Sequence, residues 1–343
     1  MGYAVVLGEA LVDLLDGECA GAPVYRQAVG GAPLNVAVGV ARLGGAVEFV
    51  GSLGDDVLAG RIRDLLSTVG VGQRGVVRRP VATTLGVVTF AGAEPDFRFY
   101  GTPPSYGLLG PEELDVPLVE GAGVLYAGSI ALLSPPVRAA ARRAWGLATG
   151  WKVFDPNVRP RLLADQSAVD ELRDVVAEFA ASADLVKLSV ADAEVLYGDD
   201  AGAPPAPGGG DRDRAAGTDG DRTTGRAGDG IAERAAERLR ALGAGTVVVT
   251  GGGARGALVW AGPTGGPEWL PAPPVDAVDA TGAGDAVMAA LVADLLADGL
   301  PAYPAGWRDR VGFALRVAGL VCESPGGAVA MPTRSDVARR FPA

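Results

Sequence analysis

Histidine is absent from this chain of 343 residues, and cysteine nearly so, with only Cys19 and Cys322. Without histidine there can be no Ser–His–Asp triad, no Cys–His pair and no His-ligated zinc. Two cysteines far apart in the sequence form neither a disulfide framework nor a CxxC metal site. Any general base must therefore be a carboxylate, Lys, Tyr or Cys, and we expect a reducing, cytoplasmic location.

Positive charge and long apolar runs are also scarce. The chain has 30 Lys and Arg residues against 41 Asp and Glu residues, which gives a net charge of −11, and it has no basic stripe. Nucleic-acid binding relies on a positive surface, and a bilayer span needs roughly 20 uninterrupted apolar residues. The first residues, which include Glu9, are typical of a buried strand and not of a signal peptide. We expect neither nucleic acid nor membrane as a partner.

Apolar residues make up 48% of the chain, which is enough for a sizeable core. Short Val-rich runs alternate with segments of helical periodicity. This alternation predicts βαβ units, and therefore an α/β fold with a mostly parallel sheet and helices on both faces. The expected strands are 3–8, 47–52, 123–128, 152–155, 185–188 and 246–250, and the expected helices are 33–43, 56–69, 136–149, 168–181 and 231–242.

Two segments, at about 10–29 and 83–106, depart from this alternation. They contain stretches in which apolar and polar residues alternate, such as VYRQAV, and which predict half-exposed antiparallel strands. We interpret them as a small sheet that acts as a lid over the mouth of the main domain. Residues 199–230 contain no Val, Leu, Ile, Met or aromatic residue, so we predict a disordered surface insertion there.

The stretch VDATGAGDAV, residues 278–287, combines bare backbone with an acid. Gly282, Ala283 and Gly284 precede Asp285, and an apolar helical run follows. The first N–H groups of a helix have no partner within the helix and lie at the positive end of its dipole, so they bind anions. Such amides would stabilise a phosphoryl group in transfer, and Asp285, kept ionised by the helix end, would accept the proton of an attacking hydroxyl. For the motif alone, an ordinary glycine turn with an N-capping Asp is the alternative.

Several segments, taken in order, resemble one family. DATGAGDAV resembles the C-terminal signature of the ribokinase-like (PfkB) carbohydrate kinases, and GGAPLNVAVGVARLG at 30–44 resembles the N-terminal one. GSLGDDVLAGRIRDLLSTVGV at 51–71, VVVTGGGARGALV at 247–259 and GGAVAMPT at 326–333 resemble further segments of the family. FDPNVRPRLL at 154–163 and VKLSVADAEVLYG at 186–198 resemble its fructokinase branch. The resemblance covers essentially the whole chain outside 199–230. It implies one ribokinase-like domain over residues 1–343, a three-layer sandwich with a small β lid, and an ATP- and Mg²⁺-dependent sugar kinase.

The resemblance also implies roles for individual residues. The amides of Gly282, Ala283 and Gly284 would form the anion hole, and Asp285 would be the general base. Glycines such as Gly30 and Gly31 let the backbone pass close to a ligand, and Asn35 offers both a donor and an acceptor to hydroxyls. The expected sugar ligands are Asp13, Gly30, Gly31, Asn35, Phe99, Asn157 and Arg159. The expected nucleotide ligands are Lys187, Thr250, Gly252, Gly253, Gly282 and Gly284. Asp192 would organise Mg²⁺ through water, and Asp279 and Thr281 would lie beside a possible K⁺ site.

One departure from the fructokinase pattern bears on the substrate. Gly101 stands where fructokinase-like sequences often carry an arginine, and Ser105 and Tyr106 replace Ala-Asp. The change lies in the lid and puts fructose in doubt more than kinase activity. Fructose, giving the 6-phosphate, is the first expectation, with 2-keto-3-deoxygluconate, a riboside or another furanose open. A sensor that binds sugar and nucleotide without transferring phosphate is the alternative of another class. Pairing of lids in the family suggests a homodimer.

Overall fold

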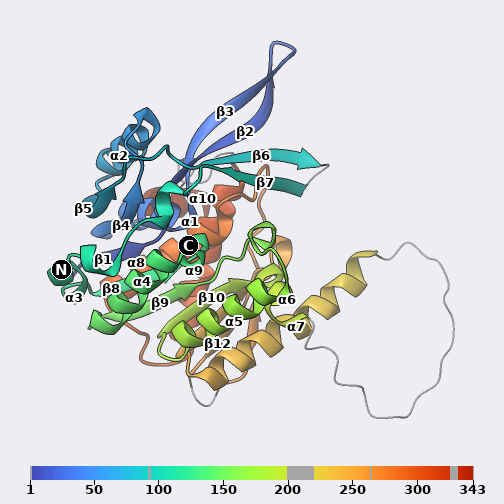
Figure 1. The fold of residues 1–343 in the computed structure, drawn as a ribbon. Helices are drawn as coiled ribbons and strands as arrows, with labels where there is room; N and C mark the ends of the chain where they lie inside the picture. Colours follow the sequence, from blue (N-terminus) through green and yellow to red (C-terminus); the bar gives the residue numbers. More distant parts are fainter. Residues whose placement is uncertain (1, 92–93, 199–219, 263–264, 325–330, 343) are drawn as a thin grey trace.

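A central sheet runs through the molecule (Figure 1). The computed structural model describes residues 2–91, 94–198, 220–262, 265–324 and 331–342. Within these residues nine strands pair in the order β13-β12-β11-β10-β9-β8-β1-β4-β5. All neighbouring pairs are parallel except those that involve β12, which runs antiparallel to both its neighbours. The strands are β1 (Ala4–Leu7), β4 (Val47–Leu53), β5 (Gly72–Arg78), β8 (Val124–Gly128), β9 (Trp151–Asp155), β10 (Leu185–Ser189), β11 (Thr246–Thr250), β12 (Ala257–Ala261) and β13 (Glu268–Leu270).

Helices cover both faces of this sheet, so the predicted three-layer α/β fold is confirmed. One face packs against α1 (Ala32–Arg42), α2 (Val57–Val69), α8 (Ala283–Asp298), α9 (Gly306–Cys322) and α10 (Arg334–Arg340). The other packs against α3 (Val116–Glu120), α4 (Pro135–Leu147), α5 (Gln166–Ala180), α6 (Val190–Tyr197) and α7 (Gly220–Leu242).

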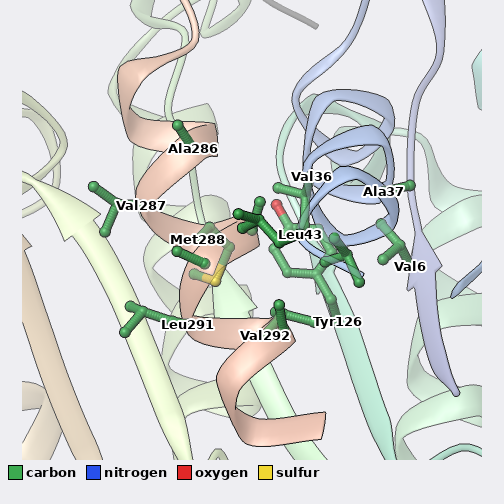
Figure 2. Packing of buried hydrophobic residues seen from close by; sticks show 14 of the residues in the cluster. Val6, Val36, Ala37, Leu43, Tyr126, Ala286, Val287, Met288, Leu291 and Val292 are labelled. Atoms are coloured by element: carbon green, nitrogen blue, oxygen red, sulfur yellow. The ribbon is translucent and has the colours of Figure 1, made fainter. Parts of the chain in front are cut away.

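The two cores follow from the period of two along each strand. In β8, Val124 and Tyr126 face the core that contains α1 and α8, and Leu125 and Ala127 face the core that contains α4 and α5. Tyr126 lies between α1 and α8, close to the packed side chains of α8 (Figure 2). The helix α8 is therefore held firmly, and its first turn is fixed relative to the sheet.

A second sheet comes from the two segments that were predicted as half-exposed strands. Within the described residues it has the order β3-β2-β6-β7, with β2 (Leu11–Cys19), β3 (Ala22–Gly30), β6 (Leu85–Ala91) and β7 (Glu94–Tyr100). Two antiparallel hairpins, β2–β3 and β6–β7, are joined by a parallel pairing of β2 with β6. This sheet projects beyond the main sheet (Figure 1). That it closes as a lid, and that the chain is one domain, stay predictions.

The insertion predicted at 199–230 ends earlier than expected. Residues 199–219 lie outside the described residues, but α7 begins at Gly220, so 220–230 are helical. The prediction of disorder was wrong for these eleven residues. The buried turns from Ala232 to Leu239 supply the nucleus, and adding turns to an existing helix costs far less than starting one. Asp229 also forms an ion pair with Arg255.

None of the helices in the described part of the chain is both long enough and apolar enough to cross a bilayer.

Candidate active site

The candidate site lies where the parallel strands of the main sheet end. Glu9 follows β1, Ser129 follows β8, Asp155 ends β9 and Ser189 ends β10. The carboxyl ends of neighbouring parallel strands share one edge, and open α/β sheets bind ligands there. The first turn of α8 brings Asp285 to the same edge, since Asp285 is hydrogen-bonded to residues that follow β3 and β9.

Asp285 is buried and its two carboxylate oxygens are held by two amides. The side-chain NH₂ of Asn35 donates to Oδ2 at 2.7 Å, and that of Asn157 donates to Oδ1 at 3.2 Å. Burial raises the pKa of Asp285 above its ordinary value, although these hydrogen bonds and the positive charges of Lys187 and Arg159 oppose the rise. The sequence suggested that the helix end would keep this acid ionised, whereas burial moves its pKa the other way. A fixed carboxylate with a raised pKa is suited to accept a proton near neutral pH.

The turn into α8 is tightly organised. Gly282 caps the helix with a φ of 81°, and the Asp279 carboxylate accepts the Thr281 amide at 2.8 Å. The Ala283 amide donates to the Ala280 carbonyl at 3.1 Å, so it already has a partner within the turn. The amides of Gly284 and Asp285 belong to the first helical turn, whose N–H groups have no partner inside a helix. The accessible part of the predicted anion hole therefore lies toward Gly284.

Asp13, predicted to bind sugar, is on β2 of the second sheet. It fits between two glycines: a Cβ on Gly30 would lie 2.3 Å from one of its oxygens, and a Cβ on Gly86 would lie 2.3 Å from the other. Only glycine leaves space for the carboxylate here. Phe99 pairs with Gly86 across β6 and β7, so it lies on the same part of this sheet. Burial raises the pKa of Asp13 to about 7, with Arg159 opposing and Asp285 adding to the rise.

Asn35 and Arg159 complete the polar groups near Asp285. Asn35 lies in the first turn of α1, after Gly31, and in the described part of the chain its buried Oδ1 has no hydrogen-bond partner. A buried acceptor without a partner is costly, so it is suited to receive a ligand hydroxyl. Arg159 is half-buried and donates to the Asn157 side chain and to two main-chain carbonyls.

Lys187 and Asp192 lie next to this cluster. Lys187 forms an ion pair with Asp155 at 3.0 Å, and both side chains are almost completely buried. Burial alone would lower the pKa of Lys187, but attraction to Asp155, Asp192 and Asp285 outweighs it and the pKa is raised. Asp192 caps α6: it accepts the Ser189 amide and hydroxyl on Oδ2, and the Val158 amide on Oδ1 at 2.8 Å.

The other predicted nucleotide residues lie one strand further along the sheet. Thr250 ends β11 beside Ser189, and Gly252 and Gly253 form the turn that follows, with φ values of 70° and 50°. These residues lie at the same edge of the sheet. Their strand β11 is two positions away from β9, which is followed by Asn157, the partner of Asp285.

Sequence reasoning missed three buried polar groups in this region. Glu9 accepts the Ser129 hydroxyl at 2.6 Å and the Ala131 amide, and burial raises its pKa to about 7. Asp155 is fully buried, and burial raises its pKa to about 6. The hydroxyl of Tyr126, within the described residues, has no hydrogen-bond partner. The signal for the two acids was a charged residue at the end of an apolar strand, as in VVLGE and KVFD.

Comparison with known proteins agrees with this geometry. The sequence profile of the pfkB family carbohydrate kinases matches residues 1–334. The chain is 34% identical over 344 residues to a fructokinase of Klebsiella pneumoniae, covering 98% of this chain and 99% of that one. It is 38% identical over 205 residues to Fructokinase-1 of Zea mays, but this covers only 62% of that protein and 57% of the chain.

A solved structure shares the fold along its whole length. The fructokinase of Vibrio cholerae O395, crystallised with fructose, ADP and calcium ion bound, has a TM-score of 0.78 at 25% identity, covering 99% of this chain and 98% of that one. Profile, sequence and fold all agree over nearly the full chain, and the chain belongs to the pfkB family of carbohydrate kinases.

Proposed function

We propose that the chain transfers the γ-phosphoryl group of ATP to a primary hydroxyl of a sugar, with fructose as the first candidate and fructose 6-phosphate as its product. The observation that carries this proposal is Asp285, a buried carboxylate fixed by Asn35 and Asn157 in the same helical turn as the accessible amide of Gly284. A base and an anion site this close are what phosphoryl transfer to an alcohol requires.

In the proposed reaction Asp285 accepts the proton of the sugar hydroxyl as its oxygen attacks the γ-phosphorus. The new O–P bond forms while the bond from the γ-phosphorus to the β–γ bridging oxygen breaks, and ADP leaves with the electron pair. The Gly284 amide and the Lys187 ammonium face the charge that develops on the transferred group. The second sheet, with Asp13, holds the sugar and excludes water when it closes.

Magnesium fits this site only if the nucleotide carries it. Among the described residues, no group of three or more Asp, Glu or Cys side chains could hold a metal ion. Mg²⁺ keeps several waters and is commonly bound through substrate phosphates, so few protein ligands suffice. Asp192, whose Oδ1 accepts a single amide among the described residues, would hold one of these waters. When bound, the ion supplies charge neutralisation of the phosphates. Asp279 and Thr281 are proposed beside a K⁺ site.

Two observations bear on the identity of the sugar. The Vibrio relative was crystallised with fructose, but Gly101 of this chain offers no side chain at the end of β7. 2-Keto-3-deoxygluconate, ribosides and other furanoses therefore stay in the test. The chain spans less than two thirds of the length of the plant fructokinases that it matches.

A sugar panel tests the proposal. ADP release is measured with fructose, 2-keto-3-deoxygluconate, a riboside and glucose, with and without K⁺, and the phosphate position of the product is assigned by ³¹P NMR. We expect ADP release with one sugar well above the others and a 6-phosphate product if that sugar is fructose. Sugar binding by calorimetry without ADP release from any of them would instead identify a sensor.

We also propose a homodimer through the second sheet. Tyr25 on edge strand β3 and Tyr100 on the opposite edge strand β7 are 55% and 54% exposed, so both are available to contact a second copy of the sheet. Light scattering after size exclusion should give twice the chain mass of 34.5 kDa, and the double variant Tyr25→Ser, Tyr100→Ser should shift it toward one chain. A single-chain mass for the unmodified protein would contradict the dimer.

A further inference from the structure

Asp155 is the residue that joins the two halves of the proposed site. It is the last residue of β9, and its side chain is completely buried. Its Oδ2 accepts the ammonium of Lys187 at 3.0 Å, and its Oδ1 accepts the main-chain amide of Asn157 at 3.1 Å. Both oxygens therefore hold residues that were assigned to different substrates.

The first contact fixes the phosphate side. Val186 pairs with Phe154, so Lys187 lies level with Asp155 on the neighbouring strand. The Lys187 ammonium reaches the turn into α8, since a Cβ placed on Gly284 would lie 2.9 Å from its Nζ. A buried lysine has a flexible stem and would otherwise occupy several positions. The ion pair with Asp155 holds its charge against the turn that receives the anion.

The second contact fixes the base side. Asn157 has a φ of 38°, in the left-handed region that non-glycine residues seldom adopt. Its side-chain NH₂ donates to Asp285, and its Oδ1 accepts from Arg159. The hydrogen bond from its main-chain amide to Asp155 holds this backbone conformation, and with it the direction from which Asn157 meets Asp285.

We propose that Asp155 is a positioning residue for phosphoryl transfer, which fixes the Lys187 ammonium against the α8 turn and fixes Asn157 against the carboxylate of Asp285. It touches neither substrate and acts through these two partners. The inference rests on the phosphoryl-transfer function proposed above, and it assigns Asn157 to the base where the sequence had assigned it to the sugar.

The test compares four variants with the unmodified chain. Asp155→Asn keeps an acceptor for Asn157 but leaves Lys187 without its counter-charge, and Lys187→Met removes the ammonium. The double variant Asp155→Asn, Lys187→Met removes the pair together and leaves no buried unpaired charge, so it keeps the comparison valid if Asp155→Asn alone does not fold. Asp184→Asn is the matched control, because Asp184 also accepts a main-chain amide, that of Lys152, but at the opposite end of β10.

We expect Asp155→Asn to lower kcat by roughly 10²-fold and the sugar KM to change less than about threefold, as for groups that act in the transition state. The double variant should be no slower than Lys187→Met by more than a few-fold, because residues that act as a unit are not additive. Calorimetry should show weaker binding of ADP to Lys187→Met and to Asp155→Asn. Asp184→Asn should match the unmodified chain in all three measurements.

A further double variant isolates the base side. Asp155→Ala, Lys187→Met also removes the acceptor of the Asn157 amide, so kcat should fall about tenfold below that of Lys187→Met, as expected for a lost hydrogen bond to a buried group. Turnover and ADP binding at the unmodified level in Asp155→Asn, with only the thermal midpoint lowered, would show a purely structural residue and overturn the inference. Failure of the proposed function looks different, because then the unmodified chain itself releases no ADP with any sugar.

Discussion

Replacing Asp285 with asparagine should separate catalysis from stability. The variant keeps the volume of the side chain but removes the proton acceptor, and losing a positioned base lowers turnover by roughly 10²- to 10⁴-fold. This corresponds to about 3–5 kcal/mol of transition-state stabilisation. The folded chain should lose little, because a neutral amide avoids the cost of burying a carboxylate. One of the two donors, Asn35 or Asn157, would then face an NH₂ group, at a cost of about 1–2 kcal/mol.

The same substitution in the same helix supplies the control. Asp294, about two and a half turns beyond Asp285 in α8, is buried and pairs with the partly exposed Arg334 at 2.6 Å. Asp294→Asn should lower the free energy of unfolding by about 1 kcal/mol, as for a partly exposed pair, and leave kcat unchanged. The assay is coupled ADP release with the preferred sugar, together with urea unfolding. Near-normal turnover in Asp285→Asn, at any stability, would refute the assignment of the base.

The pH dependence of turnover provides a second reading of the same residue. Burial raises the pKa of Asp285, so the carboxyl takes up its proton at a higher pH than an ordinary Asp. A protonated acid cannot accept the hydroxyl proton, and kcat should fall as the pH drops through this raised pKa. The acid limb should therefore lie above the ordinary Asp range and disappear in Asp285→Asn. An acid limb retained by the variant would assign it to another group.

Gly86, Glu9 and Mg²⁺ each allow a further test. Gly86→Ala places a Cβ 2.3 Å from an oxygen of Asp13 and should raise the sugar KM by about tenfold or more, a loss of about 1.4 kcal/mol or more, with the ATP KM unchanged. Gly17→Ala on the same strand as Asp13 meets nothing closer than 4.0 Å and should leave both constants unchanged; an equal effect of the two would contradict the role of Asp13. Burial raises the pKa of Glu9 from 4.5 to about 7, so the folded state binds the extra proton and the unfolding free energy falls as pH rises between these values, by up to about 3 kcal/mol. Asp13 and Asp155, whose pKa values burial raises to about 7 and about 6, add to the same slope. Glu9→Gln should therefore reduce the slope in urea unfolding across pH 4.5–7, and an unchanged slope would place the proton elsewhere. Removing Mg²⁺ with a chelator should abolish ADP release while calorimetry still detects sugar binding, and turnover without a divalent ion would contradict the proposed phosphate neutralisation.

The sequence predicted the fold well where local patterns determine it. Val-rich runs are compatible with buried parallel strands, and the strands expected at 3–8, 123–128 and 246–250 agree with β1, β8 and β11 within one residue at each end. Strands β5 and β13 escaped notice because they lie at the sheet edges and carry a mixed pattern, and β12, next to one edge, is a run of only five residues. The start of α7 at Gly220 was not predictable from its polar composition, since tertiary packing of later turns extends the helix.

The position of the candidate site was predictable, but the contacts between its residues were less so. Asp13 and Asn35 lie near the start of the sequence and Asp285 near its end, and strand-end positions and family motifs were enough to group them. The pairing of Asp155 with Lys187, 32 residues apart, depends on the order of β9 and β10 in the sheet, which no local pattern gives. The contact from Asn157 to Asp285 depends on a left-handed backbone at a non-glycine residue, which the sequence does not reveal.

The most direct measurement is a crystal structure of the Asp285→Asn variant with a non-hydrolysable ATP analogue and the preferred sugar. We expect the terminal phosphate to accept the Gly284 amide and a primary hydroxyl of the sugar to lie within hydrogen-bonding distance of residue 285. A terminal phosphate bound away from the start of α8, or a sugar whose hydroxyls all lie beyond reach of residue 285, would contradict the account.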